Sequence, residues 1–278
     1  MAIAEIAETL RLPGYADMLL ARHRAHAETF RDIVAAMPLV AGQRVLEVAC
    51  GDGAWSQWLS ERLAPRGLVV GVDACADYVE LARRRAARLE SGDRVQVVFQ
   101  QGDARDLTQA DKTFDAVTCC HSFYEIDAPI SSLSEMVRVL RPGGHLCLVT
   151  SDAFHHALLP WPSGLQVQAQ RAHDAALAKA GDHRPFLSRH LTQVLHDLGM
   201  RNIRRRAFTT TRQGPLSEDD RRYLHDWLGY VQRWAEAEQT RSQRDELRLW
   251  VAECMERSNE PSFAVTYVDM LTHAERPA

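Results

Sequence analysis

The residues best placed to do chemistry follow a short apolar run near residue 45. Val45, Leu46 and Val48 suit a strand that is buried on both faces, and Gly51 and Gly53 permit a tight turn directly after it. The helix predicted after this turn points its free backbone N–H groups and its positive dipole end at whatever lies over the turn. The stretch therefore predicts a site for an anionic or carboxylate-bearing ligand.

Two carboxylates follow the next two predicted strands. Asp73 comes 20 residues after Gly53, where an acidic side chain can accept hydrogen bonds from both hydroxyls of a ribose. Asp103, in the run Gly102-Asp103-Ala104, could accept a hydrogen bond from an adenine amino group. The glycine turn and these two carboxylates together indicate a binding site for a nucleoside at one edge of a sheet.

The elements that must position these residues alternate between strand and helix. Besides the first strand, β-rich runs bounded by turn residues predict strands at 68–73, 95–101, 114–120 and 145–150, with helices at 76–89 and 129–140. The last helix ends at Arg141-Pro142-Gly143-Gly144, which turns the chain into the fifth strand. Strands joined by helices imply right-handed crossovers and a parallel sheet, so we expect a doubly wound α/β fold.

The remaining segments predict one domain over residues 1–278 with additions to the sheet. Apolar spacing predicts a leading helix over 15–37, within an N-terminal helical segment at 1–37, and Tyr15 there could cap the ligand or simply pack. Further helices are expected at 186–198, 216–235 and 241–258, and strands at 202–211 and 263–271. We expect the segments 152–184 and 216–258 to be helical insertions that form a substrate lid.

Composition narrows the class of protein. The net charge of −4 over 278 residues gives no support for a nucleic-acid or anionic-membrane partner, and no apolar run is long enough to span a bilayer. The six cysteines show no C-x-x-C spacing, and the N-terminus does not resemble a signal peptide, which favours reduced thiols in a cytoplasmic protein. Packing explains the cysteines better than a metal site does.

With these features in register, the chain resembles the class I S-adenosylmethionine-dependent methyltransferases, in particular small-molecule enzymes with a UbiE-like core. The resemblance is strong over residues 40–152 and looser to 271. The family's first motif, acidic-x-Gly-x-Gly-x-Gly, falls on Glu47, Ala49, Gly51 and Gly53, with alanine in place of the first glycine. It implies a Rossmann-like methyltransferase fold with a seven-stranded, mostly parallel sheet.

The resemblance also implies which residues bind the cofactor, S-adenosylmethionine. The glycine turn would lie against its methionine part, Asp73 would hold the ribose, and Asp103 with Ala104 would contact the adenine. The end of the fourth strand, Cys119 to His121, would line the transferable methyl. The cofactor-binding set is then Glu47, Ala49, Cys50, Gly51, Gly53, Asp73, Ala74, Asp103, Ala104, Cys120 and His121.

Methyl transfer from a sulfonium needs alignment in a dry pocket more than it needs a catalytic base. If the nucleophile carries a proton, histidine is the usual base, and His121, His155 and His156 follow strands at the edge where ligands bind. We expect one of the three to be needed for turnover. His121 could alternatively serve as a wall of the cofactor site. Tyr124 and Glu125 are weaker candidates.

The acceptor is less well defined. Aromatic residues in the two insertions suit a small organic acceptor, although they could equally be core of a helical layer; they are Trp161, Phe186, Trp227, Tyr230 and Trp234. Oligomeric state is left open, with a homodimer as one option.

Three other readings compete with methyl transfer to a small organic acceptor. A nicotinamide site lacks its third glycine, which falls on Ser56. A cofactor-binding regulator, lyase or cyclase stays open. An arsenic methyltransferase is disfavoured because Cys119 and Cys120, adjacent on a strand, point to opposite faces.

Overall fold

The computed structural model describes residues 12, 14–88, 95–151, 157–180, 184, 187–236 and 238–278. Its helices are α2 (Ala16–Ala25), α3 (Ala27–Ala36), α4 (Ala54–Leu63), α5 (Ala76–Ala86), η1 (Phe123–Glu125), α6 (Pro129–Val139), α7 (Ser163–Ala180), α8 (Leu187–Asp197), α9 (Glu218–Glu236) and α10 (Arg241–Arg257). Its strands are β1 (Arg44–Val48), β2 (Leu68–Asp73), β3 (Gln96–Gln101), β4 (Phe114–Cys120), β5 (Leu140–Thr150), β6 (Ala157–Leu158), β7 (Arg201–Gln213) and β8 (Ala264–Glu275).

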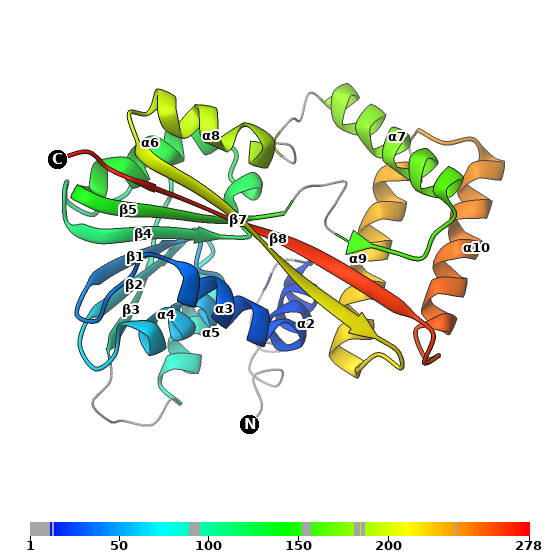
Figure 1. Ribbon diagram of the computed structural model, residues 1–278, viewed down its shortest axis with the longest axis horizontal. Helices are drawn as coiled ribbons and strands as arrows, with labels where there is room; N and C mark the ends of the chain where they lie inside the picture. The colour runs from blue at the N-terminus through cyan, green and yellow to red at the C-terminus, as the bar shows by residue number, and fades with distance from the viewer. Residues whose placement is uncertain are drawn as a thin grey trace.

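The strands form one doubly wound sheet in the order β3-β2-β1-β4-β5-β8-β6, with β7 paired to β8 (Figure 1). The five strands from β1 to β5 are parallel, while β8 is antiparallel to its neighbours β5, β6 and β7. The order reverses between β1 and β4. In such sheets this switch point opens a crevice at the carboxyl ends of the strands, where ligands bind.

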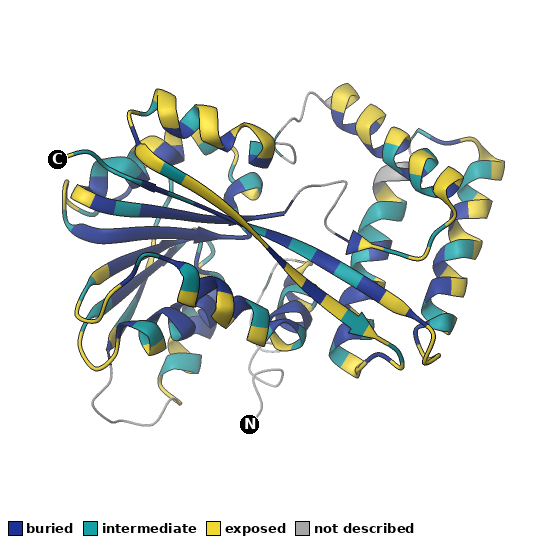
Figure 2. Ribbon diagram, viewed as in Figure 1, coloured by how far each residue is buried: buried dark blue, intermediate teal, exposed yellow. Residues whose placement is uncertain are grey.

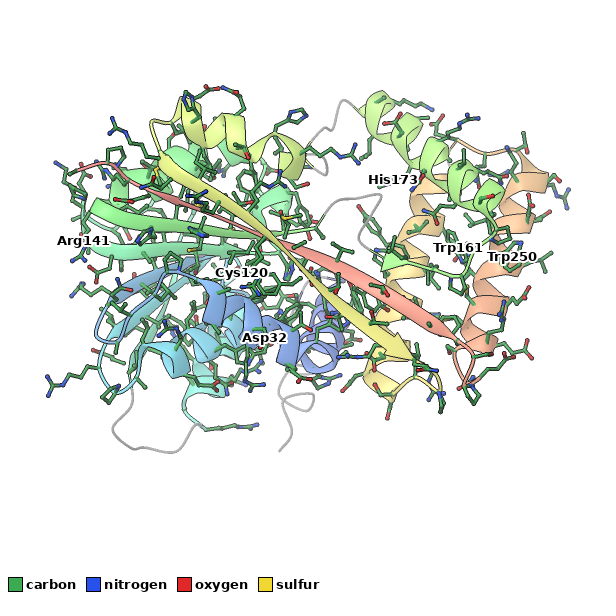
Figure 3. The ribbon with its side chains drawn as sticks, viewed as in Figure 1. Asp32, Cys120, Arg141, Trp161, His173 and Trp250 are labelled. Atoms are coloured by element: carbon green, nitrogen blue, oxygen red, sulfur yellow. The ribbon has the colours of Figure 1, made fainter. Side chains whose placement is uncertain are left out.

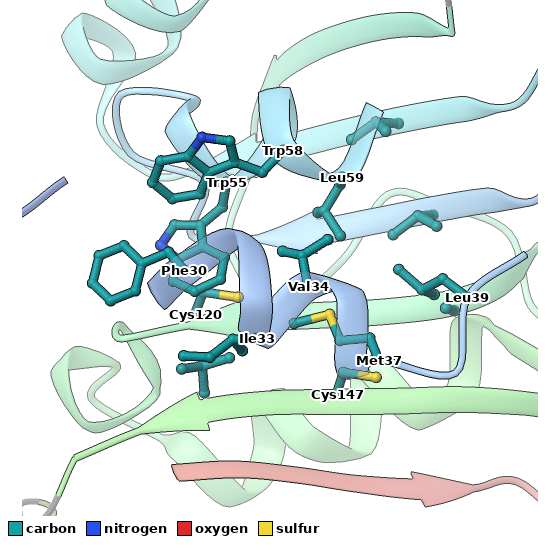
Figure 4. Packing of buried hydrophobic residues seen from close by; sticks show 14 of the residues in the cluster. Phe30, Ile33, Val34, Met37, Leu39, Trp55, Trp58, Leu59, Cys120 and Cys147 are labelled. Atoms are coloured by element: carbon teal, nitrogen blue, oxygen red, sulfur yellow. The ribbon is translucent and has the colours of Figure 1, made fainter. Parts of the chain in front are cut away.

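Helices cover both faces of the sheet. On one face α3 and α4 pack over β1, β4 and β5, and Phe30, Ile33, Trp55, Trp58 and Leu59 are all buried there (Figure 4). The other face is covered by α6 and α8, whose apolar side chains include Leu133, Met136, Leu191 and Leu195. The central strands β1, β2 and β4 are buried over most of their length, while the outer faces of the helices are exposed (Figure 2).

Two long strands carry the chain beyond this core. β7 and β8 run together from the sheet to the side of the molecule where α7, α9 and α10 lie (Figure 1). There Tyr223, Leu224 and Leu228 of α9 join Leu247 of α10 and Tyr267 of β8 in a separate apolar cluster. The extension therefore attaches a helical layer beside the carboxyl edge of the parallel strands.

Most predicted elements are present, with three differences. The predicted leading helix over 15–37 is two helices, because His26 leaves helical geometry with φ −110° and ψ 14°. The fifth strand begins at Leu140, since Phe114 pairs with Leu140 before a register shift. The two-residue strand β6 brings the sheet to eight strands instead of seven.

Phe99 shows how closely the strands and helices pack. Its ring lies over β2, and a Cβ added at Gly71 would stand 2.6 Å from it. We therefore expect Gly71→Ala to lower the free energy of unfolding by about 1–3 kcal/mol in urea denaturation, because the ring cannot move without overpacking its neighbours. Gly164→Ala is the matched control: a Cβ there meets nothing within 4 Å, so its midpoint should stay level or rise slightly. Equal effects of the two substitutions would contradict this account.

Candidate active site

A cavity of about 870 Å³ lies at the carboxyl edge of the parallel strands. Residues after β1, β2, β3, β4 and β5 contribute to its wall, among them Ala49, Asp73, Asp103, His121 and Ser151. Helices α2 and α9 complete the wall opposite the strands. The volume falls within the roughly 300–1,000 Å³ that is usual for small-molecule sites.

The turn after β1 adopts the left-handed backbone that its glycines predict. Gly51 has φ +51°, and Ala49, at the position of the missing first glycine, also lies in this region with φ 57°. A Cβ at Gly51 would meet only Leu19, at 3.6 Å. At Gly53, in contrast, a Cβ would stand 2.9 Å from Phe99. Gly51 therefore borders the cavity, whereas Gly53 serves helix packing.

Asp73 joins the ends of β1 and β2. Its two carboxylate oxygens accept the backbone N–H groups of Gly51 and Cys75, each at 2.9 Å. Burial raises the pKa of Asp73 despite these two bonds. Each oxygen keeps a lone pair, so the carboxylate can still accept hydrogen bonds from the hydroxyls of a ligand in the cavity.

Asp103 lies at the cavity wall but is much more exposed. Its carboxylate forms a bidentate ion pair with Arg105, with a shortest distance of 2.6 Å. Hydrogen bonds from Arg105 lower the pKa of Asp103, so it remains a carboxylate acceptor at neutral pH. The next residue, Ala104, lies beside it on the wall.

Glu47 is buried below the turn and does not reach the cavity. Its side chain accepts a hydrogen bond from Ser56, the residue that replaces the third glycine of a nicotinamide motif. Burial, opposed by the Ser56 bond and reinforced by Asp52 and Asp73, raises the pKa of Glu47 to about 8. At neutral pH the side chain is therefore largely protonated and acts as a structural support of the turn.

Asp52, within the turn itself, is completely buried and contacts two basic side chains that sequence reasoning missed. It lies 3.0 Å from His23 of α2 and 2.5 Å from Arg85 of α5. Burial alone would raise the pKa of Asp52, but His23 and Arg85 outweigh it and lower the pKa to about 2. The glycine turn is thereby fastened to the helix that covers the cavity.

A second buried ion pair, also missed, lies on the side of the cavity beyond β4. Arg22, next to His23 on α2, donates a hydrogen bond of 2.7 Å to Asp269 of β8. The same Asp269 oxygen is 2.9 Å from Nε2 of His121. Since an ionised carboxylate only accepts, His121 must carry its proton on Nε2, which leaves Nδ1 as the acceptor nitrogen.

The His121 ring is enclosed rather than exposed to the cavity. Its side chain is 2% accessible and packs between Phe30 and Trp55, at ring-centroid distances of 5.1 and 5.5 Å. Burial and Arg22, opposed by Asp269, lower the pKa of His121 to about 4. The imidazole is therefore neutral at pH 7.

The structure brings most of the predicted cofactor residues to the cavity. Its wall includes Ala49, Gly51, Asp73, Ala74, Asp103, Ala104 and His121. Glu47, Cys50, Gly53 and Cys120 lie behind it, because strand alternation and the packing of Phe99 turn them into the core. His155 and His156 lie outside the described residues. Cys119 and Cys120 belong to clusters on opposite faces of the sheet, as their adjacency predicts.

The predicted aromatic residues divide between cavity and core. Trp227 and Tyr230 of α9 line the cavity. Trp161 packs in the helical layer with Trp250, where its Nε1 lies 3.0 Å from Sγ of Cys254 (Figure 3). Phe186 and the side chain of Trp234 lie outside the described residues. Of the predicted lid, α9 contributes to the wall directly, and α7 and α10 pack behind it.

Two tyrosines, Tyr15 and Tyr78, line the cavity, and only Tyr15 could be found from the sequence. Both line it, with ring centroids 6.3 Å apart, and Tyr15 is about half exposed. Burial and the nearby Asp73 raise the pKa of Tyr15 to about 12. The leading segment ahead of the first strand is the signal that Tyr15 could cap the site, whereas its place beside a Pro-Gly turn favours packing; Tyr78 has only an unremarkable place in a helix.

The core of the chain has the Rossmann-like fold of the methyltransferases. A family model described as "Methyltransferase domain" matches residues 45–144, the part of the chain that holds the glycine turn, Asp73 and Asp103. Demethylmenaquinone methyltransferase from Symbiobacterium thermophilum is 38% identical over 125 residues, which is 45% of this chain and 49% of that protein. The chain thus spans about half the length of the curated relatives it matches.

Solved structures extend the likeness in fold over nearly the whole chain. Phosphoethanolamine N-methyltransferase 2 from Haemonchus contortus, in complex with S-adenosylhomocysteine, superposes with a TM-score of 0.56 at 13% identity and covers all of this chain and 61% of that one. The [4+2]-cyclase SpnF superposes with a TM-score of 0.53 at 18% identity, over 92% of this chain and 82% of that one.

Two negative findings concern the described residues alone. No helix among them is long and apolar enough to cross a membrane. Within the same ranges, no three histidine, cysteine or acidic side chains gather in a way that could hold a metal ion.

The protonation of Glu47 gives a prediction about stability. The folded pKa of about 8 lies above the ordinary glutamate value of 4.5, so the stabilisation is complete below pH 4.5 and is lost as pH rises toward 8. Glu47→Gln keeps the shape of the protonated form without the titration. We expect it to remove a loss of about 3 kcal/mol between pH 5 and 8, measured by urea denaturation across this range. Parallel pH curves for the wild type and Glu47→Gln would show that Glu47 does not titrate there.

Proposed function

We propose that this protein transfers a methyl group from S-adenosylmethionine to a small organic acceptor. The observation that carries the proposal is the cavity over the switch point, where Gly51 leaves room beside the chain and Asp73 faces the opening. The matched methyltransferase domain covers this part of the chain and supports the same assignment.

The donor half of the cavity, which is the part next to the ends of β1, β2 and β3, has residues that fit the cofactor. Asp73 offers acceptor oxygens for the ribose hydroxyls, and Asp103 with Ala104 offers an acceptor and an apolar surface for the adenine. Tyr78 adds a buried hydroxyl on the cavity wall that has no hydrogen-bond partner among the described residues. A bound polar ligand would satisfy it, which an apolar ligand would not.

The cofactor supplies a methyl group on a positively charged sulfur, so the leaving group departs neutral. The protein's task is then to align the two reactants and exclude water. Helices α2 and α9 close the cavity opposite the strands, and the His121 ring at its wall packs against Phe30 and Trp55. These packed side chains and the strand ends would keep bulk water away from the methyl group of the cofactor.

A role in cofactor binding without methyl transfer is a second candidate. It is favoured by one observation: His121, the described histidine nearest the end of β4, is an enclosed imidazole whose pKa of about 4 makes it a weak base. Release of S-adenosylhomocysteine with a panel of hydroxyl, amine and thiol acceptors separates an enzyme from a binder.

Asp73→Asn tests the donor site. Replacing an ionised acceptor of two ribose hydroxyls should weaken S-adenosylmethionine binding by about 10- to 100-fold, measured by calorimetry, since hydrogen bonds to charged groups contribute about 1.5–3 kcal/mol. Glu80→Gln is the matched control, because Glu80 pairs with Arg84 on the surface and does not line the cavity. Unchanged affinity in Asp73→Asn, or no binding by the wild type at millimolar concentration, would remove the proposed function.

The histidines are tested separately. We expect alanine at one of His121, His155 and His156 to reduce turnover at least 10-fold while S-adenosylmethionine affinity stays within about twofold, since a general base contributes 10²–10⁴-fold. Full activity in all three variants on the true acceptor would show that no histidine base is used.

A further inference from the structure

The acceptor half of the cavity, which is the part next to η1 and α9, contains a buried cation with a hydrogen-bond donor that is not used. Arg22 lines the cavity, and its side chain is only 8% accessible. Its contact with Asp269 involves one nitrogen, Nη2, and one oxygen, Oδ1. Nε is buried and has no hydrogen-bond partner within the described residues. An arginine with five donors is therefore fastened through one end while another donor stays unsatisfied.

Burial makes this arrangement costly without a ligand. A buried N–H that lacks a partner is destabilising, and buried polar groups are normally completed by a protein group, a water or a bound ligand. Oδ1 of Asp269 already accepts from Nη2 of Arg22 and also contacts Nε2 of His121. The Arg22 guanidinium thus keeps one buried donor, Nε, that no described residue satisfies.

The surroundings of Arg22 are aromatic and belong to the acceptor side. Its guanidinium carbon lies 5.5 Å from the ring centroid of Tyr223 on α9, and Tyr124 of η1 forms a hydrogen bond with it. Burial raises the pKa of Tyr124, so its phenol remains neutral and does not compete as an anion. Trp227 and Tyr230 continue the same wall.

Two further arginines line the cavity nearer to solvent, and they differ in whether they form ion pairs. Arg222 forms ion pairs with Asp17 and Asp226, at 2.9 and 3.0 Å. Arg233, also at the cavity, forms no ion pair with any described residue. The α9 wall therefore adds a second cation on the approach to Arg22.

We propose that Arg22 binds an anionic oxygen of the acceptor, so that the acceptor class is a ring-bearing carboxylic acid or phenolate. This rests on the proposed function and deepens it. The planar guanidinium matches a carboxylate fork in geometry, and the aromatic wall stacks on the ring that carries it. Asp269 is the positioning residue that holds the guanidinium in place and orients His121.

The test compares 2-naphthoate with 2-naphthamide, which has the same shape but no charge, on protein saturated with S-adenosylhomocysteine. Calorimetry should show the acid binding at least 10-fold more tightly than the amide. The variant Arg22→Met/Asp269→Asn removes both charges together, so that no buried carboxylate is left unpaired. It should lose the preference for the acid while its affinity for S-adenosylhomocysteine stays within threefold.

Arg24→Gln is the matched control, because Arg24 lies on the same helix and pairs with Asp219 at the surface. It should keep the preference. If the double variant does not fold, Arg22→Lys, which keeps the charge but not the fork, should reduce the preference at least threefold.

Other outcomes overturn the inference in distinguishable ways. Equal binding of acid and amide by the wild type, or a preference that persists in the double variant or in Arg22→Lys, would show that Arg22 does not hold an anion of the acceptor. A loss of S-adenosylhomocysteine affinity confined to the double variant would place the guanidinium on the cofactor's own carboxylate instead. Failure of the wild type to bind S-adenosylhomocysteine would remove the proposed function itself.

Discussion

Two buried ion pairs from adjacent residues hold the cover of the cavity in place, and both halves of the site depend on them. His23 reaches Asp52 in the glycine turn, and Arg22 reaches Asp269 in the last strand. Both carboxylates are fully buried. Removing Arg22 would leave Asp269 uncompensated in the core, which typically costs about 3–5 kcal/mol, whereas Asp52 would keep its ion pair with Arg85 if His23 were removed. A single turn of α2 thereby ties the donor half to the acceptor half.

The donor half is the part that local sequence signals can predict. β2 and β4 have the predicted bounds because each is a short apolar run between turn residues, and the position of Asp73 follows from the end of its strand. Alternation along a strand also predicts that Cys119 and Cys120 face opposite layers. Spacing alone does not show which motif residues reach the ligand. Gly53 belongs to the motif, but the space beside it is filled by the ring of Phe99.

The acceptor half could not be predicted for a different reason. Arg22 and Asp269 are separated by 247 positions in the sequence, and they meet only because β8 inserts antiparallel beside β5. Nothing local marks Asp269, which alternates with apolar residues in a strand and resembles any edge carboxylate. No sequence pattern predicts that Arg22 is buried either, because its partner is brought to it only by the tertiary fold. The break at His26, which separates α2 from α3, likewise reflects packing against Tyr223 and Tyr267.

This division explains why likeness to known proteins is informative about the donor and much less so about the acceptor. The matched domain ends at residue 144, before β6, α7, α9 and the long β7–β8 pair. Those elements supply Tyr223, Trp227 and Asp269, the groups that surround Arg22. Because a buried ion pair gives little net stability compared with apolar residues of the same volume, stability is a weak reason for Arg22 to stand at the cavity. A buried guanidinium at the cavity wall, whose Nε has no hydrogen-bond partner within the described residues, is better explained by the anion it can bind.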